Sequence, residues 1–132
     1  MPGLTIRRTL DLDCSPTDLW RLVTDPHSLS GWLGREVEID ARSGGQGRVL
    51  DDDGIIRLLV VDEVVPGERL SFTWWPQADD AAASEVTFTV QEADEGSRLV
   101  VTETASAVVA DGGSWDTRLI SLWLAVCSQV TV

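Results

Sequence analysis

Residues 15–34, SPTDLWRLVTDPHSLSGWLG, contain two helix starts in close succession. Ser15 can cap a first helix, because its hydroxyl can accept a backbone N–H from the first turn and the proline that follows suits the first helical position. Asp25, also followed by proline, ends that helix and begins a second one in the same way. We therefore expect two short consecutive helices near the start of the chain.

The chain on either side of these helices alternates between apolar and polar side chains, which is typical of half-buried strands. Turn residues, mostly glycine, aspartate and proline, separate the alternating segments. Strands joined by short turns pair antiparallel, so one seven-stranded antiparallel sheet is expected. The predicted strands are Leu4–Asp13, Glu36–Arg42, Arg48–Asp51, Ile55–Val65, Arg69–Trp75, Glu85–Glu92 and Arg98–Ala107.

The last part of the chain changes from alternation to helical spacing. Ser114 can cap a helix of about sixteen residues, or ~24 Å. Its apolar stripe consists of Trp115, Leu119, Leu122, Trp123 and Val126. The sequence thus predicts a single α+β domain, residues 1–132, in which the C-terminal helix packs across a curved sheet.

Charge and composition exclude several classes of function. The 132 residues include 22 acidic and 10 basic groups, all of the basic ones arginine, which gives a net charge of −12. A chain this acidic is repelled by phosphate backbones, so nucleic acid is not an expected partner. One histidine and two cysteines cannot form the usual zinc sites, and we expect neither a metal nor a cofactor.

Compartment is also constrained by the sequence. Cys14 and Cys127 lie far apart and are interpreted as free thiols, which indicates a reducing cytoplasm. We expect no targeting segment, because no apolar run follows the charges near the N-terminus. No stretch is apolar for long enough to cross a bilayer, so a membrane is not an expected partner.

Four stretches resemble the START-like (SRPBCC) superfamily, most closely the bacterial branch related to the Aha-type activators of the heat-shock chaperone ATPase. Residues 15–34 resemble the opening of such domains, and residues 37–45, VEIDARSGG, resemble the second strand and its Asp-x-Arg-x-Gly-Gly turn. Residues 66–74, PGERLSFTW, and 97–102, SRLVVT, resemble the fifth and seventh strands. The resemblance implies the helix-grip fold. It also implies a function among binders of hydrophobic small molecules, aromatic polyketide cyclases and chaperone regulators.

Arg8 and Glu103 are the most informative polar residues. Each shares a strand face with apolar neighbours, and the resemblance implies that their strands are adjacent. We therefore predict an ion pair between them on the concave face of the sheet. This pair is either structural or a polar anchor for a ligand in a mostly apolar pocket. Glu103 stands where the family pattern often has histidine, and Asp62 stands where it usually has an apolar residue.

A cavity is expected between the terminal helix and the sheet, because a curved sheet meets a straight helix along only part of its length. Its predicted lining is Phe72, Trp74, Phe88, Leu119, Leu122 and Trp123, with Trp32 at the mouth. The alternative is that these side chains are ordinary core. The short helix leaves such a cavity open at one end or completed by a second subunit, and the apolar Val130 and Val132 favour a homodimer contact.

Two further motifs are not expected to carry chemistry. His27, the only imidazole, falls in the first turn of a helix, where exposure is normal, so no catalytic residue is predicted. Residues 51–54, DDDG, lack the spaced ligands of a calcium loop and are interpreted as a solvated hairpin turn.

The leading hypothesis is therefore binding of a hydrophobic or aromatic small molecule in the cavity, anchored by Arg8 and Glu103. One alternative is a protein-interaction module that resembles the chaperone ATPase activators, whose acidic surface would favour a basic partner. Another is a polyketide cyclase-like enzyme, although the absence of tyrosine and of an inward-facing histidine disfavours catalysis.

Overall fold

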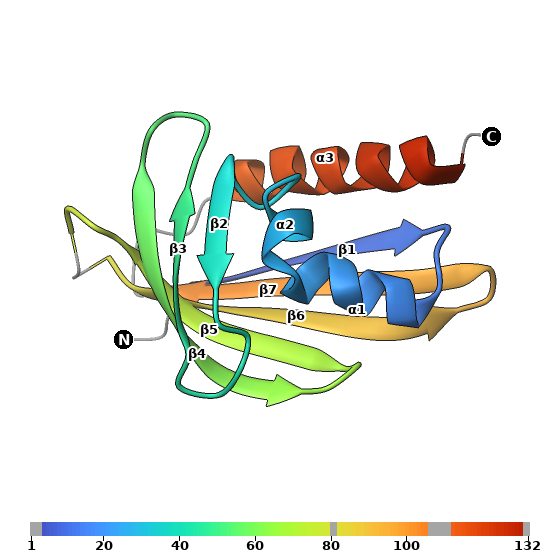
Figure 1. Cartoon of the computed structure of the whole chain (residues 1–132), viewed down its shortest axis with the longest axis horizontal. Helices are drawn as coiled ribbons and strands as arrows, with labels where there is room; N and C mark the ends of the chain where they lie inside the picture. Colours follow the sequence, from blue (N-terminus) through green and yellow to red (C-terminus); the bar gives the residue numbers. More distant parts are fainter. Residues whose placement is uncertain (1–3, 80–81, 106–111, 131–132) are drawn as a thin grey trace.

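A computed structural model describes residues 4–79, 82–105 and 112–130, and confirms the predicted α+β helix-grip architecture (Figure 1). Its seven strands form one antiparallel sheet in the order β1-β7-β6-β5-β4-β3-β2. Two short helices follow β1, and a long helix follows β7. The elements are β1 (Leu4–Leu12), α1 (Pro16–Thr24), α2 (Pro26–Leu29), β2 (Glu36–Ile39), β3 (Gln46–Leu50), β4 (Ile56–Val65), β5 (Arg69–Pro76), β6 (Ser84–Ala93), β7 (Gly96–Ala105) and α3 (Gly112–Val130).

The caps predicted for α1 and α2 are present. The Ser15 hydroxyl accepts the Asp18 backbone N–H at 3.1 Å, and an Asp25 carboxylate oxygen accepts the Ser28 N–H at 2.9 Å. Hydrogen bonds from the Ser28 backbone and hydroxyl lower the pKa of Asp25, because they stabilise the ionised carboxyl. Local capping chemistry thus fixes where both helices begin.

The inner face of the sheet carries the core. Alternate residues of β5, β6 and β7 point inward, and Leu70, Phe72, Val86, Phe88 and Leu99 have no exposed surface. The pairing of β4 with β5 shifts between Val61 and Glu63, which is a bulge of the kind that bends a sheet. Helix α3 lies along the inner side of the sheet beside the edge strand β1 (Figure 1).

Several element bounds differ from expectation. Helix α3 has 19 residues and is therefore longer than the sixteen predicted, and β2 ends at Ile39 instead of Arg42. Strand β2 stops because the chain turns back at Gly45, where a Cβ atom would come within 2.0 Å of the Asp40 carbonyl oxygen. The predicted continuation of β7 to Ala107 and the tail residue Val132 lie outside the described residues, as does the Val130 side chain.

Candidate functional site

A pocket of ≈ 640 Å³ opens where the first half of α3 meets the far end of the sheet. Its walls come from the segment after α2, the β3–β4 connection, the ends of β5 and β6, one residue of β7, and α3. The lining used below consists of Trp32, Asp51, Arg57, Trp74, Ser84, Glu103 and Arg118. Segments remote in sequence therefore supply charged and aromatic side chains to one hollow.

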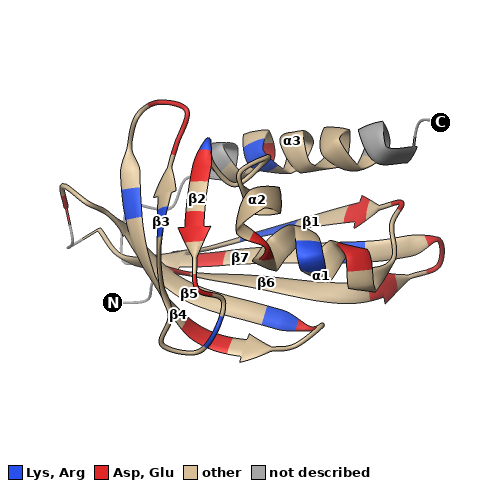
Figure 2. Ribbon diagram, in the orientation of Figure 1, with Lys and Arg blue, Asp and Glu red and all other residues tan. Residues whose placement is uncertain are grey.

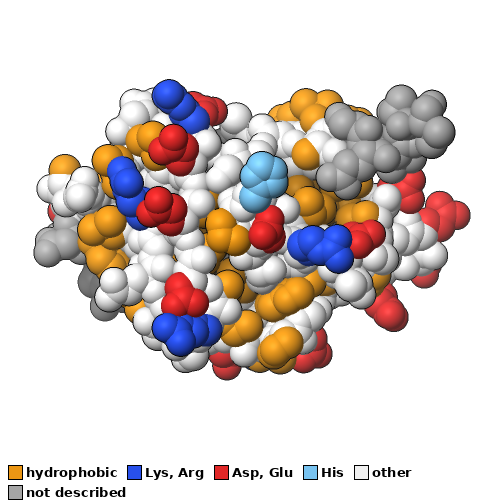
Figure 3. All heavy atoms as spheres, viewed as in Figure 1, with side chains coloured by type: hydrophobic (Ala, Val, Ile, Leu, Met, Phe, Trp, Pro, Cys, Tyr) orange, Lys and Arg blue, Asp and Glu red, His pale blue; other side chains and the backbone are white. Residues whose placement is uncertain are grey.

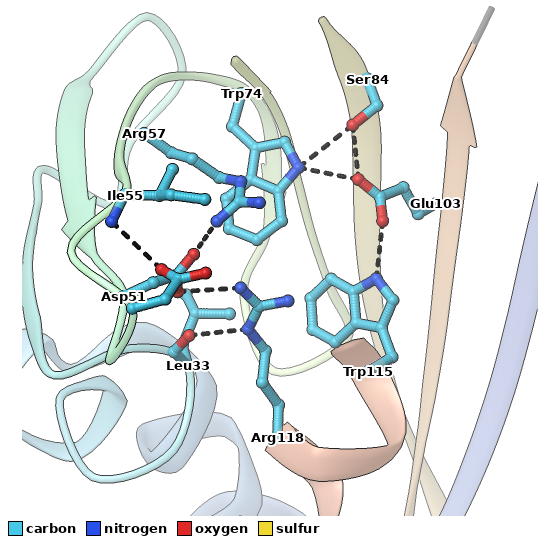
Figure 4. A network of polar contacts seen from close by, with 10 residues as sticks. Leu33, Asp51, Ile55, Arg57, Trp74, Ser84, Glu103, Trp115 and Arg118 are labelled. Carbon is cyan, nitrogen blue, oxygen red and sulfur yellow. Dashed lines mark hydrogen bonds and ion pairs between the residues drawn. The ribbon is translucent and has the colours of Figure 1, made fainter. Parts of the chain in front are cut away.

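An arginine–aspartate network forms one wall of this pocket (Figure 4). Asp51, at the end of β3, forms ion pairs with Arg57 on β4 and with Arg118 on α3, where the Arg118 Nη2–Asp51 Oδ1 distance is 2.9 Å. The Arg118 Nε also donates to the Leu33 carbonyl at 2.9 Å. Asp51 is 8% exposed and Arg118 9%. Because buried charges are tolerated only when paired, this network fixes α3 against the sheet.

Trp74 packs against both guanidinium groups. The Arg57 Cζ lies 5.0 Å from the centroid of the Trp74 ring, and the Arg118 Cζ lies 5.2 Å from it. Arg118 also lies 5.1 Å from the centroid of Trp115, and the two indole rings stack at 5.8 Å and 22°. These distances are within the range of cation–π attraction, which strengthens in a partly desolvated site.

Glu103 carries a second buried carboxylate, 8% exposed, on the neighbouring wall (Figure 4). It accepts hydrogen bonds from the indole N–H of Trp74 at 2.8 Å and of Trp115 at 2.7 Å. The Ser84 hydroxyl donates to the same oxygen as Trp74. Charge-assisted bonds of this kind compensate for burial of the carboxylate. Glu103 thereby positions Trp74, which lines the pocket, and Trp115, which stacks on Trp74.

The predicted ion pair between Arg8 and Glu103 is wrong. Both residues occupy inward-facing positions of their strands, but Arg8 lies opposite Val101. The Arg8 Nε donates a hydrogen bond to Asp116 Oδ1 of α3 at 2.8 Å. Glu103 lies opposite Ile6 and is satisfied by Trp74, Trp115 and Ser84. The reason is the position of α3, which brings the Asp116 carboxylate to Arg8 and the Trp115 indole to Glu103.

The predicted cavity lining is also corrected. Phe72, Phe88 and Leu122 have no exposed surface, and the Phe72 and Phe88 rings meet edge to face at 5.5 Å, so these residues belong to the core. Trp74 and the expected mouth residue Trp32 do line the pocket. Leu119 and Trp123 instead line a separate groove between α3 and β1. The Phe88 ring also meets Trp115, in the first turn of α3, edge to face at 5.9 Å.

Four residues of this lining, Asp51, Arg57, Ser84 and Arg118, were not predicted from the sequence. Asp51 was expected in a solvated turn, but two arginines bury it. Arg118 follows Trp115 by three residues and precedes Leu122 by four, so it lies in the apolar stripe of its helix. A charge in that stripe was the available signal for a buried ion pair. The pairing of Arg57 with Asp51 could not be predicted from the sequence pattern, because it depends on the geometry of the β3–β4 hairpin.

Other groups remain outside the site. The His27 side chain is exposed, as Figure 3 shows. Cys14 is a free thiol, and burial raises its pKa, which lowers its reactivity. Within the described ranges, no three His, Cys, Asp or Glu side chains gather closely enough to hold a metal ion. None of the helices in that part of the chain is long and apolar enough to cross a membrane.

Comparison with solved structures places this arrangement among known folds. MLL2253 from Mesorhizobium loti is 22% identical, with a TM-score of 0.84 over 98% of this chain and 100% of its own. DynU16, from the dynemicin biosynthetic locus, matches with 22% identity and a TM-score of 0.84 over 95% of this chain, which spans only 48% of DynU16. The Aha1 dimer from Colwellia psychrerythraea is 15% identical, with a TM-score of 0.79 over 93% of this chain and 96% of its own.

The sequence itself settles the family. None of the curated proteins matches it. The sequence pattern of one family, described as Activator of Hsp90 ATPase homolog 1-like protein, matches residues 13–116, from the cap of α1 to the first turns of α3. That span includes Trp32, Asp51, Trp74 and Glu103 of the pocket. The predicted resemblance is confirmed, and the chain belongs to the Activator of Hsp90 ATPase homolog 1-like family within the START-like (SRPBCC) proteins.

Proposed function

We propose that this protein binds a small, flat aromatic molecule that carries polar substituents, in the pocket beside Trp74. The observation that carries the proposal is a pocket of ≈ 640 Å³ with indole rings and buried charged groups among its lining residues. Ligand sites in proteins are typically about 300–1,000 Å³ and combine apolar walls with a few convergent polar groups.

A cysteine thiol of the kind found at Cys14 fits a reducing compartment such as the cytoplasm.

The chemistry of the wall narrows the class of ligand. Trp32, 4% exposed, and Trp74, 3% exposed, line the pocket, so a small part of each indole is available to an aromatic ring. Guanidinium donors and carboxylate acceptors lie beside them, so hydroxyl or carbonyl substituents can be oriented. A purely hydrophobic ligand would desolvate these charged groups without replacing their contacts with water, which is costly. A polar aromatic molecule is therefore favoured over a lipid-like one.

A titration with quercetin, a flat hydroxylated aromatic compound, tests the proposal by tryptophan fluorescence. We expect saturable quenching in the wild type that is strongly reduced in Trp74→Phe. Trp75→Phe is the matched control, because Trp75 is the next residue and points to the opposite face of β5. Equal quenching in both variants would contradict this site. Native mass spectrometry of the purified protein adds an independent readout, since a co-purified small molecule would appear as a mass increment.

Association with a second copy of the chain is the second candidate function. One observation favours it: Ile120, Trp123 and Leu124 are large apolar side chains exposed on one helix. The relative from Colwellia psychrerythraea, solved as a dimer, supports the same idea. Molar mass in solution, measured by light scattering over a range of concentrations, distinguishes a monomer from a dimer.

A further inference from the structure

We infer that the chain dimerises through the outer side of α3 and the groove between α3 and β1. This inference rests on the second candidate function and names the surface and the partner, which is an identical copy. The surface, called the α3 face below, consists of Arg8, Thr9, Leu10, Asp116, Leu119, Ile120, Trp123 and Leu124.

The α3 face combines a hollow with a ridge. The groove has a volume of ≈ 470 Å³ and lies between β1 and α3. Beside it, Ile120 is 60% exposed, Trp123 47% and Leu124 53%. These positions are spaced i, i+3 and i+4, so they share one side of the helix. A ridge next to a hollow suits a twofold contact, in which each copy presents both shapes to the other.

The distribution of charge favours an identical copy over a basic partner. None of residues 119–132 is charged, in a chain whose net charge is −12. Figure 2 shows the same contrast: in the part of α3 that is not grey, blue and red lie only near its start. A basic protein would be attracted to acidic surface elsewhere. A neutral surface is what an acidic chain needs to approach its own copy without direct repulsion.

The charges that border the α3 face are already balanced. Arg8 and Asp116 pair with each other at the groove, so each copy would present one cation and one anion there. In a twofold contact, Arg8 of each copy could face Asp116 of the other copy, so opposite charges would meet across the interface. Hydrophobic side chains also gather over α3 on the surface seen in Figure 3.

Sedimentation equilibrium of the full chain tests the inference. We expect a reversible dimer in the wild type, with a Kd that rises about ten-fold or more in Ile120→Glu and in Leu124→Glu. Ile55→Glu adds the same charge at an exposed apolar residue outside the α3 face and should leave the Kd unchanged. Higher salt should tighten the dimer, because screening weakens repulsion between two acidic copies.

The outcomes separate the surface from the function. A wild type that stays monomeric at all concentrations overturns both the dimer and this inference. A dimer that survives both α3 substitutions overturns only the surface. A monomer that co-sediments with phosphatidylcholine vesicles, and loses this binding in Ile120→Glu and Leu124→Glu, would assign the α3 face to lipid and overturn the inference. Quercetin binding at the pocket should be equal in wild type and Ile120→Glu, because Ile120 does not line that pocket.

Discussion

Each side of α3 carries an exception to the usual distribution of polarity. On the pocket side, Trp115 and the charged Arg118 are buried, and Arg118 reaches Asp51 and Leu33. On the other side, Ile120, Trp123 and Leu124 are exposed. Helices at protein surfaces normally bury apolar residues and expose charged ones. Arg118 shows that a charge can be buried among the apolar residues of this helix where carboxylate and carbonyl acceptors lie within hydrogen-bond distance.

Arg118→Leu should produce the largest change, because it removes the cation shared by Asp51 and the Leu33 carbonyl. We expect a loss of about 3–5 kcal/mol in the free energy of unfolding, as when one partner of a buried ion pair is removed. Urea unfolding followed by circular dichroism measures it. Arg21→Leu is the matched control on α1, where the arginine is exposed and should contribute under about 1 kcal/mol. Similar losses in both variants would contradict the contrast.

Glu103→Ala should cost about 2–4 kcal/mol, because two buried indole N–H groups and the Ser84 hydroxyl lose their acceptor. Glu103→Gln should recover part of this, since an amide oxygen can still accept. Thermal unfolding gives the stabilities, and near-ultraviolet circular dichroism reports the packing of Trp74 and Trp115. If Gln were as damaging as Ala, the charge rather than the hydrogen bonds would be essential.

Arg8→Ala should cost under about 1 kcal/mol, because its partner Asp116 is largely exposed and water screens the pair. The double variant with Glu103→Ala sharpens this prediction. The two effects should add within about 0.5 kcal/mol, as expected for residues that share no partner. A larger coupling energy, measured by urea unfolding, would indicate a direct contact between Arg8 and Glu103 and would contradict the structure.

Ile120→Ser should have the smallest effect on the isolated chain, within about 0.5 kcal/mol of wild type, because its side chain is mostly exposed. Leu122→Ala, two residues along, should cost about 2–5 kcal/mol, because Leu122 is fully buried. Unfolding in dilute protein measures both. Similar values for the two variants would remove the difference between the two sides of α3.

Local patterns predicted most of the fold. The caps at Ser15 and Asp25 depend on neighbours three residues away, and alternation placed Trp74 and Glu103 on the inner face of the sheet. The partners of Glu103 could not be predicted in this way. They depend on where α3 lies relative to β1 and β5, which is set by packing of segments far apart in sequence.

The candidate site was harder to predict for the same reason. Asp51 belongs to a run of three aspartates, and nothing local separates it from Asp52, which is exposed. Asp51 becomes a buried residue through Arg57 on the next strand and Arg118, 67 residues later. Trp123 shares the helical stripe of Trp115 by spacing, yet Trp115 is buried and Trp123 is half-exposed, because the sheet beneath the helix is curved and ends at β1.

Every basic residue of this chain is arginine, and this affects the stability of the fold in alkaline solution. Guanidinium groups stay protonated beyond any ordinary pH, so the Asp51 network and the surface ion pairs keep their charge where lysine pairs would neutralise. Burial raises the pKa of Cys14, so its contribution is complete below the ordinary thiol pKa and is lost as pH rises through the raised value. Arg98 lowers the pKa of Asp11, whose contribution is lost as pH falls through the lowered value. Alkaline pH should therefore destabilise this fold through ionisation of the Cys14 thiol. The arginine–carboxylate pairs should break only in acid, where the carboxylates become protonated.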